Sequence, residues 1–372
     1  MKKILVFGIT DLPGGVESVI MNYYRNIDRK KIQFDFLCNT EKVAYEDEIK
    51  LLGGTIYRIT ARSKDIKKYK KDMKDFFGKH SKEYSTIWVN ICSLANIDYL
   101  KYAKKYGIKH RIIHCHNSQN MDSFLRGLLH RWNKLFITKY ATDFWSCSDD
   151  ASKWFFRKKI MQSDRYLVIK NAINLERFKY NEKIRNDYRK ELDLENKFVI
   201  GHVGRFHFQK NHKFLIKVFN EIHKNDKTAL LLLIGNGEEQ EEIKKMVKSY
   251  DLEKHVRFLG PRQDVAELMQ AMDVFIFPSV FEGLGVVLIE AQTAGLPIYA
   301  SANVIPSEVE IIKENFNFLS LSYGELYWAD KILNDFKERK YNRTIDLGII
   351  ESCGYNIKKE KQKMESNFIK EN

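Results

Sequence analysis

The sequence has few of the features that mark secreted, disulfide-bonded or membrane-spanning proteins. Among 372 residues there are only five prolines and five cysteines, and no apolar run approaches the roughly 18 residues that a membrane-spanning helix needs. The cysteines are scattered, odd in number and form no Cys-x-x-Cys pair, so we expect reduced thiols in a cytoplasmic protein and no zinc site. The apolar run Ile4 to Phe7 is too short for a signal peptide, and we expect it to form a first buried strand.

The positive charge is concentrated in one half of the chain. The net charge is +14, but residues 1–180 hold 35 Lys and Arg against 19 Asp and Glu, whereas residues 181–372 hold 28 against 30. This asymmetry points to an anionic partner of the first half, either anionic lipid or nucleic acid, and a solvated lysine-rich surface is the simpler alternative. The basic stretches show neither zinc-finger spacing nor an RNA-recognition signature, so nucleic-acid binding is a remote alternative and we expect none.

Short apolar runs alternate with stretches of helical length from end to end. The runs expected to form strands are residues 4–8, 34–38, 86–91, 111–116, 143–147 and 166–170, then 198–203, 229–235, 256–259, 274–278 and 297–300. Such alternation predicts an α/β fold with parallel sheets covered on both faces. Because each half begins with a strand and a glycine-rich loop, we expect two tandem Rossmann-like domains that face a central cleft.

A chain of 372 residues is longer than one hydrophobic core usually carries, so we expect two domains, residues 1–180 and 181–355. The charged stretch 179–197 is expected to link them. Residues 356–372 read as one amphipathic helix, which we expect to cross back and pack on the N-terminal domain.

Ligands of open α/β sheets bind beyond the carboxyl ends of the strands, so residues there are candidates for a site. Gly14 and Gly15 follow the first expected strand and precede a helix, where backbone can approach an anion closely; a plain tight turn explains them equally well. His116 ends the strand 111–116, and its alternative is a hydrogen-bonded structural histidine.

The second half carries stronger signals. The loop 204–211 follows a strand and supplies Arg205 and Lys210, two cations that could neutralise a diphosphate, unless the loop is simply solvated. The stretch 281–291 contains Glu282, a glycine-rich loop and Glu290 in an apolar helix. A carboxylate in such a run is costly unless it is used or paired, the alternative being a buried structural glutamate.

In their order along the chain, these motifs resemble the retaining glycosyltransferases of family 4, which have the two-domain GT-B fold. The resemblance covers nearly the whole chain. The sequence is similar in particular to members from bacterial capsule and exopolysaccharide assembly. The segments that carry it are Pro13-Gly14-Gly15, Lys170-Asn171-Ala172-Ile173-Asn174 with Phe178, Gly204-Arg205 with Lys210, Glu282 with Glu290, Ile305-Pro306-Ser307-Glu308, and Ser352-Cys353-Gly354-Tyr355.

The resemblance implies a role for each candidate residue. Arg205 and Lys210 would hold the donor diphosphate, which Gly15 would approach from the other domain. Glu282 would contact the sugar hydroxyls and Glu290 the ribose, while His116 would lie beside the reacting sugar. The remaining donor-binding residues would be Gly283, Leu284, Gly285 and Val286, whose amides meet the sugar and phosphate, and the turn from Leu259 to Arg262, which packs on the base.

The resemblance also implies a metal-independent hexosyltransferase-type enzyme (EC 2.4). Its donor would be a nucleotide sugar, in the first place a UDP-sugar, and its acceptor a glycan or a polyprenyl-diphosphate-linked glycan. No Asp-x-Asp pair occurs in the chain, so neither a diphosphate-holding metal nor another cofactor is expected. A nucleotide-sugar epimerase, or another enzyme of the same fold such as a phosphorylase, remains the alternative.

Such an acceptor lies at an anionic membrane, so we expect a cytoplasmic protein bound peripherally at the inner face of the cell membrane. Residues 62–82 and 124–136 mix basic with aromatic and aliphatic residues in the manner of helices that lie on membranes. Both stretches are hypothesised to contact the lipid.

Overall fold

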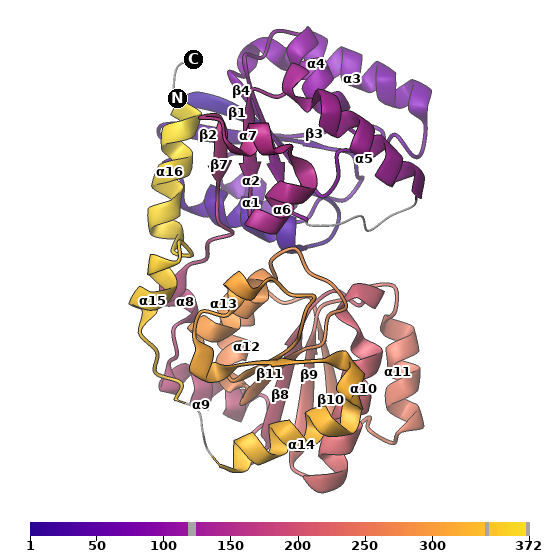
Figure 1. Cartoon of the computed structure of the whole chain (residues 1–372), viewed down its shortest axis with the longest axis vertical. Coiled ribbons are helices and arrows are strands. Elements are labelled where there is room, and N and C mark those ends of the chain that lie inside the picture. Colours follow the sequence, from indigo (N-terminus) through magenta and orange to yellow (C-terminus); the bar gives the residue numbers. More distant parts are fainter. Residues whose placement is uncertain (118–123, 339–341, 370–372) are drawn as a thin grey trace. The chain divides into compact units, whose positions relative to one another are not determined.

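The computed structural model describes residues 1–117, 124–338 and 342–369, and the chain divides into two compact units (Figure 1). The first unit comprises Met1–Ala172 together with Asn356–Asn372, and the second comprises Ile173–Tyr355. Each unit is built on one parallel sheet whose strands alternate with helices. The expected α/β class with two Rossmann-like domains is therefore confirmed.

The first unit contains a seven-stranded sheet in the order β3-β2-β1-β4-β5-β6-β7. Its strands are β1 (Lys2–Phe7), β2 (Ile32–Cys38), β3 (Ile56–Arg58), β4 (Thr86–Ile91), β5 (His110–Cys115), β6 (Asp143–Ser146) and β7 (Tyr166–Val168). Its helices are α1 (Gly15–Asn26), α2 (Glu46–Leu51), α3 (Ile66–His80), α4 (Asp98–Lys105), α5 (Phe124–Phe136), α6 (Asp149–Phe155), α7 (Lys158–Met161) and α16 (Ile357–Ile369). The central strands are buried on both faces, because helices cover both.

The second unit contains a six-stranded sheet in the order β10-β9-β8-β11-β12-β13. Its strands are β8 (Phe198–Val203), β9 (Ala229–Ile234), β10 (Val256–Gly260), β11 (Val274–Phe277), β12 (Ile298–Ser301) and β13 (Phe316–Leu319). Its helices are α8 (Leu175–Phe178), α9 (Glu182–Glu191), α10 (His212–Asn225), α11 (Gln240–Ser249), α12 (Val265–Ala271), α13 (Val286–Thr293), α14 (Gly324–Lys337) and α15 (Leu347–Ser352).

The boundary between the units lies at Ala172–Ile173, so its expected position after residue 180 is wrong. Ile173, Leu175 and Phe178 are buried in the hydrophobic core of the second unit, which commits this segment to that unit. The charged stretch 179–197 is also no linker, because most of it forms α9. Charge alone misled the prediction, since the basic residues of α9 serve the packing of the second unit.

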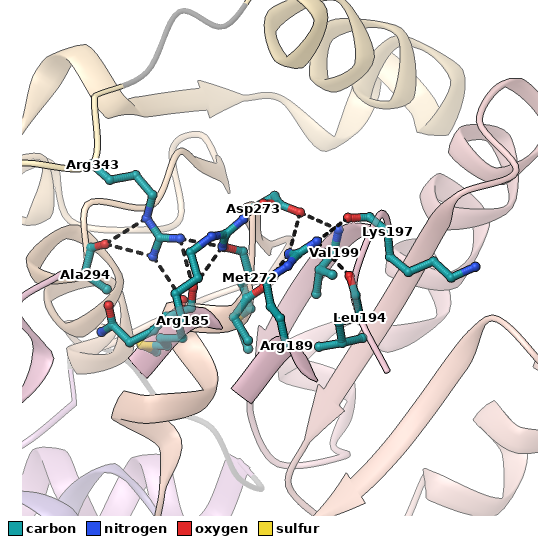
Figure 2. A network of polar contacts seen from close by, with 12 residues as sticks. Arg185, Arg189, Leu194, Lys197, Val199, Met272, Asp273, Ala294 and Arg343 are labelled. Atoms are coloured by element: carbon teal, nitrogen blue, oxygen red, sulfur yellow. Dashed lines mark hydrogen bonds and ion pairs between the residues drawn. The ribbon is translucent and has the colours of Figure 1, made fainter. Parts of the chain in front are cut away.

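A network of arginines holds α9 in place (Figure 2). Arg185 donates to Asp273 at 2.5 Å and to the Met272 carbonyl at 2.7 Å. Arg189 donates to Asp273 at 3.2 Å and to the Ala271 carbonyl at 2.9 Å. Arg343 reaches the same place, donating to the Met272 carbonyl at 2.8 Å. The carbonyls at the carboxyl end of a helix lack intrahelical hydrogen-bond donors. At the end of α12, three guanidinium groups donate to these carbonyls.

The C-terminal helix α16 belongs to the first unit, where it packs against α1 (Figure 1). Phe368 is buried against Phe34, Trp88 and Trp145, with ring centroids 5.3 to 5.7 Å away. The last part of the expected helix, residues 370–372, lies outside the described residues. Within the described ranges, no helix is both long and apolar enough to cross a membrane.

Candidate active site

Two loops meet at the centre of the second sheet, where the strand order reverses between β8 and β11. The loop after β8 and the loop after β11 are joined by hydrogen bonds. The Val280 amide donates to the Gln209 carbonyl at 2.8 Å, and the Gln209 side chain donates to the Phe281 carbonyl at 3.0 Å. A crevice at such a reversal is the usual ligand site of an open α/β sheet, so both loops stand where a ligand is expected.

Lys210 and Glu282 form an ion pair across these loops. The Lys210 Nζ lies 2.6 Å from Glu282 Oε1, and the two side chains are 17% and 6% exposed. Lys210 also lies over the Phe277 ring, 4.5 Å from its centroid. An ammonium group donates several hydrogen bonds, so Lys210 can hold Glu282 and still donate to an anion.

Arg205 is held in a different manner. Its guanidinium lies 3.3 Å from Glu238, and both side chains are more than half exposed. His207 Nε2 approaches the same carboxylate at 3.6 Å. An exposed ion pair contributes little to stability, so Arg205 can exchange Glu238 for an incoming phosphate at small cost.

The helix α13 begins at Val286, directly after the glycine-rich loop, and it contains Glu290 as the sequence predicted. Gly285 precedes it with a φ of +73°, a left-handed conformation that favours glycine. The Glu282 amide donates to the Val304 carbonyl at 3.2 Å, which fixes the loop just before Gly283 and Leu284. The amino end of α13 therefore offers backbone amides and a favourable dipole to an anion.

Glu290 lies within α13, and desolvation raises the pKa of its carboxyl to about 7. The opposing influence is the positive charge of Arg177, in α8, which lowers this pKa. A carboxylate kept in such surroundings is costly for the fold, which is typical of a group retained for a ligand.

The end of β10 and the turn that follows it hold the two remaining donor-side predictions, Leu259 and Arg262. Leu259 is partly buried against the hydrophobic core of the unit. Arg262 donates to Asp264 at 2.7 and 2.5 Å, and Asp264 also accepts from Tyr188 at 3.2 Å. The Arg262 side chain is therefore held by Asp264 within this turn. At Gly260 the space beside the backbone is open, since a Cβ built there would meet nothing within 4 Å.

Gly15 and His116 belong to the first unit, whereas the other predicted residues belong to the second. Gly15 is the first residue of α1, and a Cβ built on it would meet nothing within 4 Å. His116 follows β5, and its Nε2 lies 2.9 Å from Asn90 Oδ1. The Asn90 amide donates to the Phe7 carbonyl at 3.2 Å, so its oxygen accepts and His116 Nε2 carries the proton.

This arrangement fixes the chemical state of His116. Burial lowers the pKa of its imidazole to about 3, so the ring is neutral. Its Nδ1 is then an acceptor, and it is buried without a hydrogen-bond partner in the described parts of the chain. Such a nitrogen can accept a hydrogen bond from a hydroxyl of a ligand but is too weak a base to remove a proton at neutral pH.

Sequence reasoning missed the residues that hold the predicted ones. Asn90 and Glu238 have no motif of their own, and only the fold brings them to His116 and Arg205. Gly235 could have been found from the sequence, since it directly follows an apolar strand as Gly204 does. A Cβ on Gly235 would lie 2.1 Å from the Gly204 carbonyl oxygen, so this glycine lets the Arg205 loop pack closely.

Residues 184–341 match the family model described as "Glycosyl transferases group 1". Over 334 residues the chain is 31% identical to a protein of Bacillus subtilis (strain 168) named "Putative glycosyltransferase EpsF", covering 86% of this chain and 84% of that relative. The chain belongs to the group 1 glycosyltransferases. The matched residues include Arg205, Lys210, Glu282 and Glu290.

Two further comparisons extend the family and the fold. A UDP-Gal:alpha-D-GlcNAc-diphosphoundecaprenol alpha-1,3-galactosyltransferase of Escherichia coli is 25% identical over 255 residues, covering 65% of this chain and 64% of the relative. The crystal structure of Anabaena Alr3699/HepE in complex with UDP and glucose matches with a TM-score of 0.79 and 18% identity over 99% of both chains. This glycosyltransferase therefore has the GT-B fold, as expected.

Proposed function

We propose that this group 1 glycosyltransferase is a retaining enzyme of family 4 that transfers a hexosyl group from a UDP-sugar to a glycan or lipid-linked acceptor. The observation that carries the proposal is the Lys210–Glu282 pair, which joins the two loops at the strand reversal of the second sheet. The names of the relatives support the biological setting, since one acts on a diphosphoundecaprenol-linked acceptor and another is an amylovoran biosynthesis glycosyltransferase of Erwinia amylovora. The process served is bacterial surface polysaccharide synthesis at the inner membrane face.

The donor is held by groups of opposite kinds. Arg205 and Lys210 bind the diphosphate, aided by the amides from Gly283 to Val286 at the amino end of α13. Glu282 accepts hydrogen bonds from sugar hydroxyls and Glu290 from the ribose. The turn from Leu259 to Arg262 packs on the base through its open backbone at Gly260.

Chemistry follows from this placement of charge. The bond between the anomeric carbon and the diphosphate oxygen breaks, and a bond from the acceptor oxygen forms on the same face of the sugar. The acceptor proton passes to the leaving diphosphate, so no protein carboxylate acts as a nucleophile. Arg205, Lys210 and the dipole of α13 stabilise the negative charge that grows on the diphosphate.

The first unit contributes positioning in this scheme. Gly15 leaves room for the diphosphate at the start of α1. His116 accepts a hydrogen bond from a hydroxyl of the reacting sugar at its neutral Nδ1, an assignment supported by the lowered pKa of the ring and by the lack of a partner for that nitrogen among the described residues.

Thermal shifts and diphosphate release with a panel of nucleotide sugars test the donor. A UDP-sugar is expected to raise the melting temperature and to yield UDP when an acceptor extract is added, with the same rate in EDTA. Loss of turnover in EDTA contradicts the metal-independent scheme. An epimerised nucleotide sugar formed without UDP release supports the epimerase alternative instead.

A further inference from the structure

The helix α5 presents its apolar side chains to solvent. Six large hydrophobic residues are between 46% and 82% exposed, namely Phe124, Leu125, Leu128, Leu129, Trp132 and Leu135. Their spacing of three and four residues places them on one face of the helix. Among the side chains of α5, only that of His130 is fully buried. Unlike an ordinary surface helix, α5 therefore exposes its apolar face to solvent.

Polar side chains hold α5 in this orientation. His130 Nδ1 accepts from the Leu94 amide at 3.1 Å, and its Nε2 lies 3.2 Å from the Trp154 carbonyl. Asn133 donates to the Leu94 carbonyl at 2.7 Å. Lys134 donates to the Trp154 carbonyl at 2.7 Å. These contacts satisfy buried backbone groups, so turning the apolar face inward would leave them unpaired.

The helix α3 shows the ordinary arrangement in the same unit. Tyr69, Met73, Phe76 and Phe77 are buried in the core beside α4, and the lysines of α3 face outward. These four side chains are thus unavailable to a membrane, and lipid contact by residues 62–82 stays a hypothesis that rests on the outward lysines and on Ile66, which is 47% exposed. The two stretches look alike in sequence, but only α5 leaves its apolar face uncovered.

A basic pocket lies at the end of this face. It has a volume of about 250 Å³ and is lined by Lys101, Trp132, Asn133, Phe136, Lys139 and Tyr140. Lys139 Nζ lies 4.9 Å from the centroid of the Phe136 ring, and Lys101 Nζ lies 5.8 Å from that of Tyr140. Lysines among aromatic rings beside an exposed apolar face match the headgroup and acyl regions of an anionic bilayer.

We propose that α5 is the membrane-docking element of this enzyme, with its apolar face in the acyl boundary of an anionic leaflet and a lipid phosphate in the Lys101–Lys139 pocket. Charge selects lipid over a second copy of the chain, because residues 1–180 carry a net charge of +16 and two such surfaces repel one another. The inference rests on the proposed function in one respect, the lipid-linked acceptor. Docking itself is measured without sugar transfer.

Co-flotation with vesicles of phosphatidylglycerol and phosphatidylethanolamine tests the docking. The wild type is expected to float, and the variant Leu125→Gln/Leu128→Gln/Leu129→Gln to bind at least tenfold more weakly. Leu326→Gln/Tyr327→Gln on α14 is the matched control, since these side chains are also about half exposed and it is expected to float like the wild type. Equal flotation of the α5 variant, or none of the wild type, overturns the proposal.

Trp132 supplies a second readout. It is 63% exposed, whereas Trp88, Trp145 and Trp328 are fully buried and Trp154 is only partly exposed, so lipid contact is expected to blue-shift mainly the emission of Trp132. Trp132→Phe is expected to remove this shift, and a shift that persists in this variant contradicts the proposal. If the α5 substitutions instead abolish a concentration-dependent dimer seen by ultracentrifugation, the face is covered by a second copy and lipid docking is wrong. A failure to bind any nucleotide sugar with flotation intact contradicts the proposed function alone.

Discussion

At the scale of single residues, burial separates two cations that the sequence presents as equals. Lys210 is mostly buried and holds Glu282, whereas Arg205 is mostly exposed and holds Glu238. We expect Lys210→Met to lower the free energy of unfolding by about 3 kcal/mol, because it removes the cation that faces a buried carboxylate. Arg205→Met is expected to change it by less than about 0.5 kcal/mol. Urea denaturation checks both values.

The same two variants are expected to behave alike toward the nucleotide. Each is expected to weaken UDP binding by roughly tenfold in calorimetry, since each removes one charged contact to the diphosphate. Lys213→Met is the control, because Lys213 is an exposed lysine of the neighbouring helix α10 that pairs with Glu242. A normal UDP affinity in Arg205→Met would remove Arg205 from the donor site.

Glu290 predicts an unusual dependence of stability on pH. Its folded-state pKa of about 7 lies above the unfolded value of 4.5, so between these values the folded state holds a proton that the unfolded state releases. The free energy of unfolding therefore falls as pH rises through this window and stays low above it. Glu290→Gln removes the titration. The variant is expected to match the wild type near pH 5 and to exceed it by at most about 3 kcal/mol near pH 8.

Urea denaturation of Glu290→Gln at the two pH values makes the comparison. The gain in stability should come with weaker UDP binding, because the neutral amide is a poorer acceptor for ribose hydroxyls. If the variant and the wild type keep the same difference at both pH values, the carboxyl of Glu290 is not desolvated in the folded protein.

At the scale of elements, arginine side chains stabilise the end of α12 by donating hydrogen bonds to its carbonyls. Arg343 donates to the carbonyls of Met269, Gln270, Met272 and Ala294, and burial lowers the pKa of its guanidinium to about 9. Arg343→Met is expected to lower the free energy of unfolding by about 2–4 kcal/mol, since the Met269 and Ala294 carbonyls lose this donor, whereas those of Gln270 and Met272 keep Arg185. Lys248→Met, at an exposed position of α11, should leave urea unfolding unchanged. Equal urea midpoints for Arg343→Met and Lys248→Met would show that Arg343 does not contribute to the stability of the fold.

The elements that the sequence predicted are the long apolar strands and the loops that follow them. β3 and β13 were missed because each is an edge strand of three or four residues, with little apolar periodicity to detect. The glycine-rich loop before α13 was predicted because glycine gives a local signal. The orientation of α5 could not be predicted, because its direction depends on Leu94 and Trp154, whose carbonyls become acceptors only in the folded unit.

At the scale of the whole molecule, the two units differ in how the chain builds them. The second unit is one continuous segment, Ile173–Tyr355, whereas the first needs the end of the chain. Besides the contacts of Phe368, Glu365 accepts from the Asp28 amide at 2.7 Å and Lys363 donates to the Val168 carbonyl at 2.6 Å. The separation of α16 from the rest of its unit explains why only its amphipathic pattern, and not its partner surface, could be read from the sequence.

This asymmetry predicts different behaviour of isolated fragments. Residues 173–355 are expected to fold alone and to unfold cooperatively in urea, because their core is complete. Residues 1–172 are expected to aggregate or bind a hydrophobic dye, because removing α16 uncovers Trp88 and Trp145. Adding a peptide of residues 356–369 should restore a cooperative transition. In the full chain, Phe368→Ala is expected to destabilise the first unit by about 3–5 kcal/mol, whereas Ile369→Ala, at a more exposed neighbour, should cost far less. A stable, dye-free fragment 1–172 would show that α16 only covers the unit and does not complete its core.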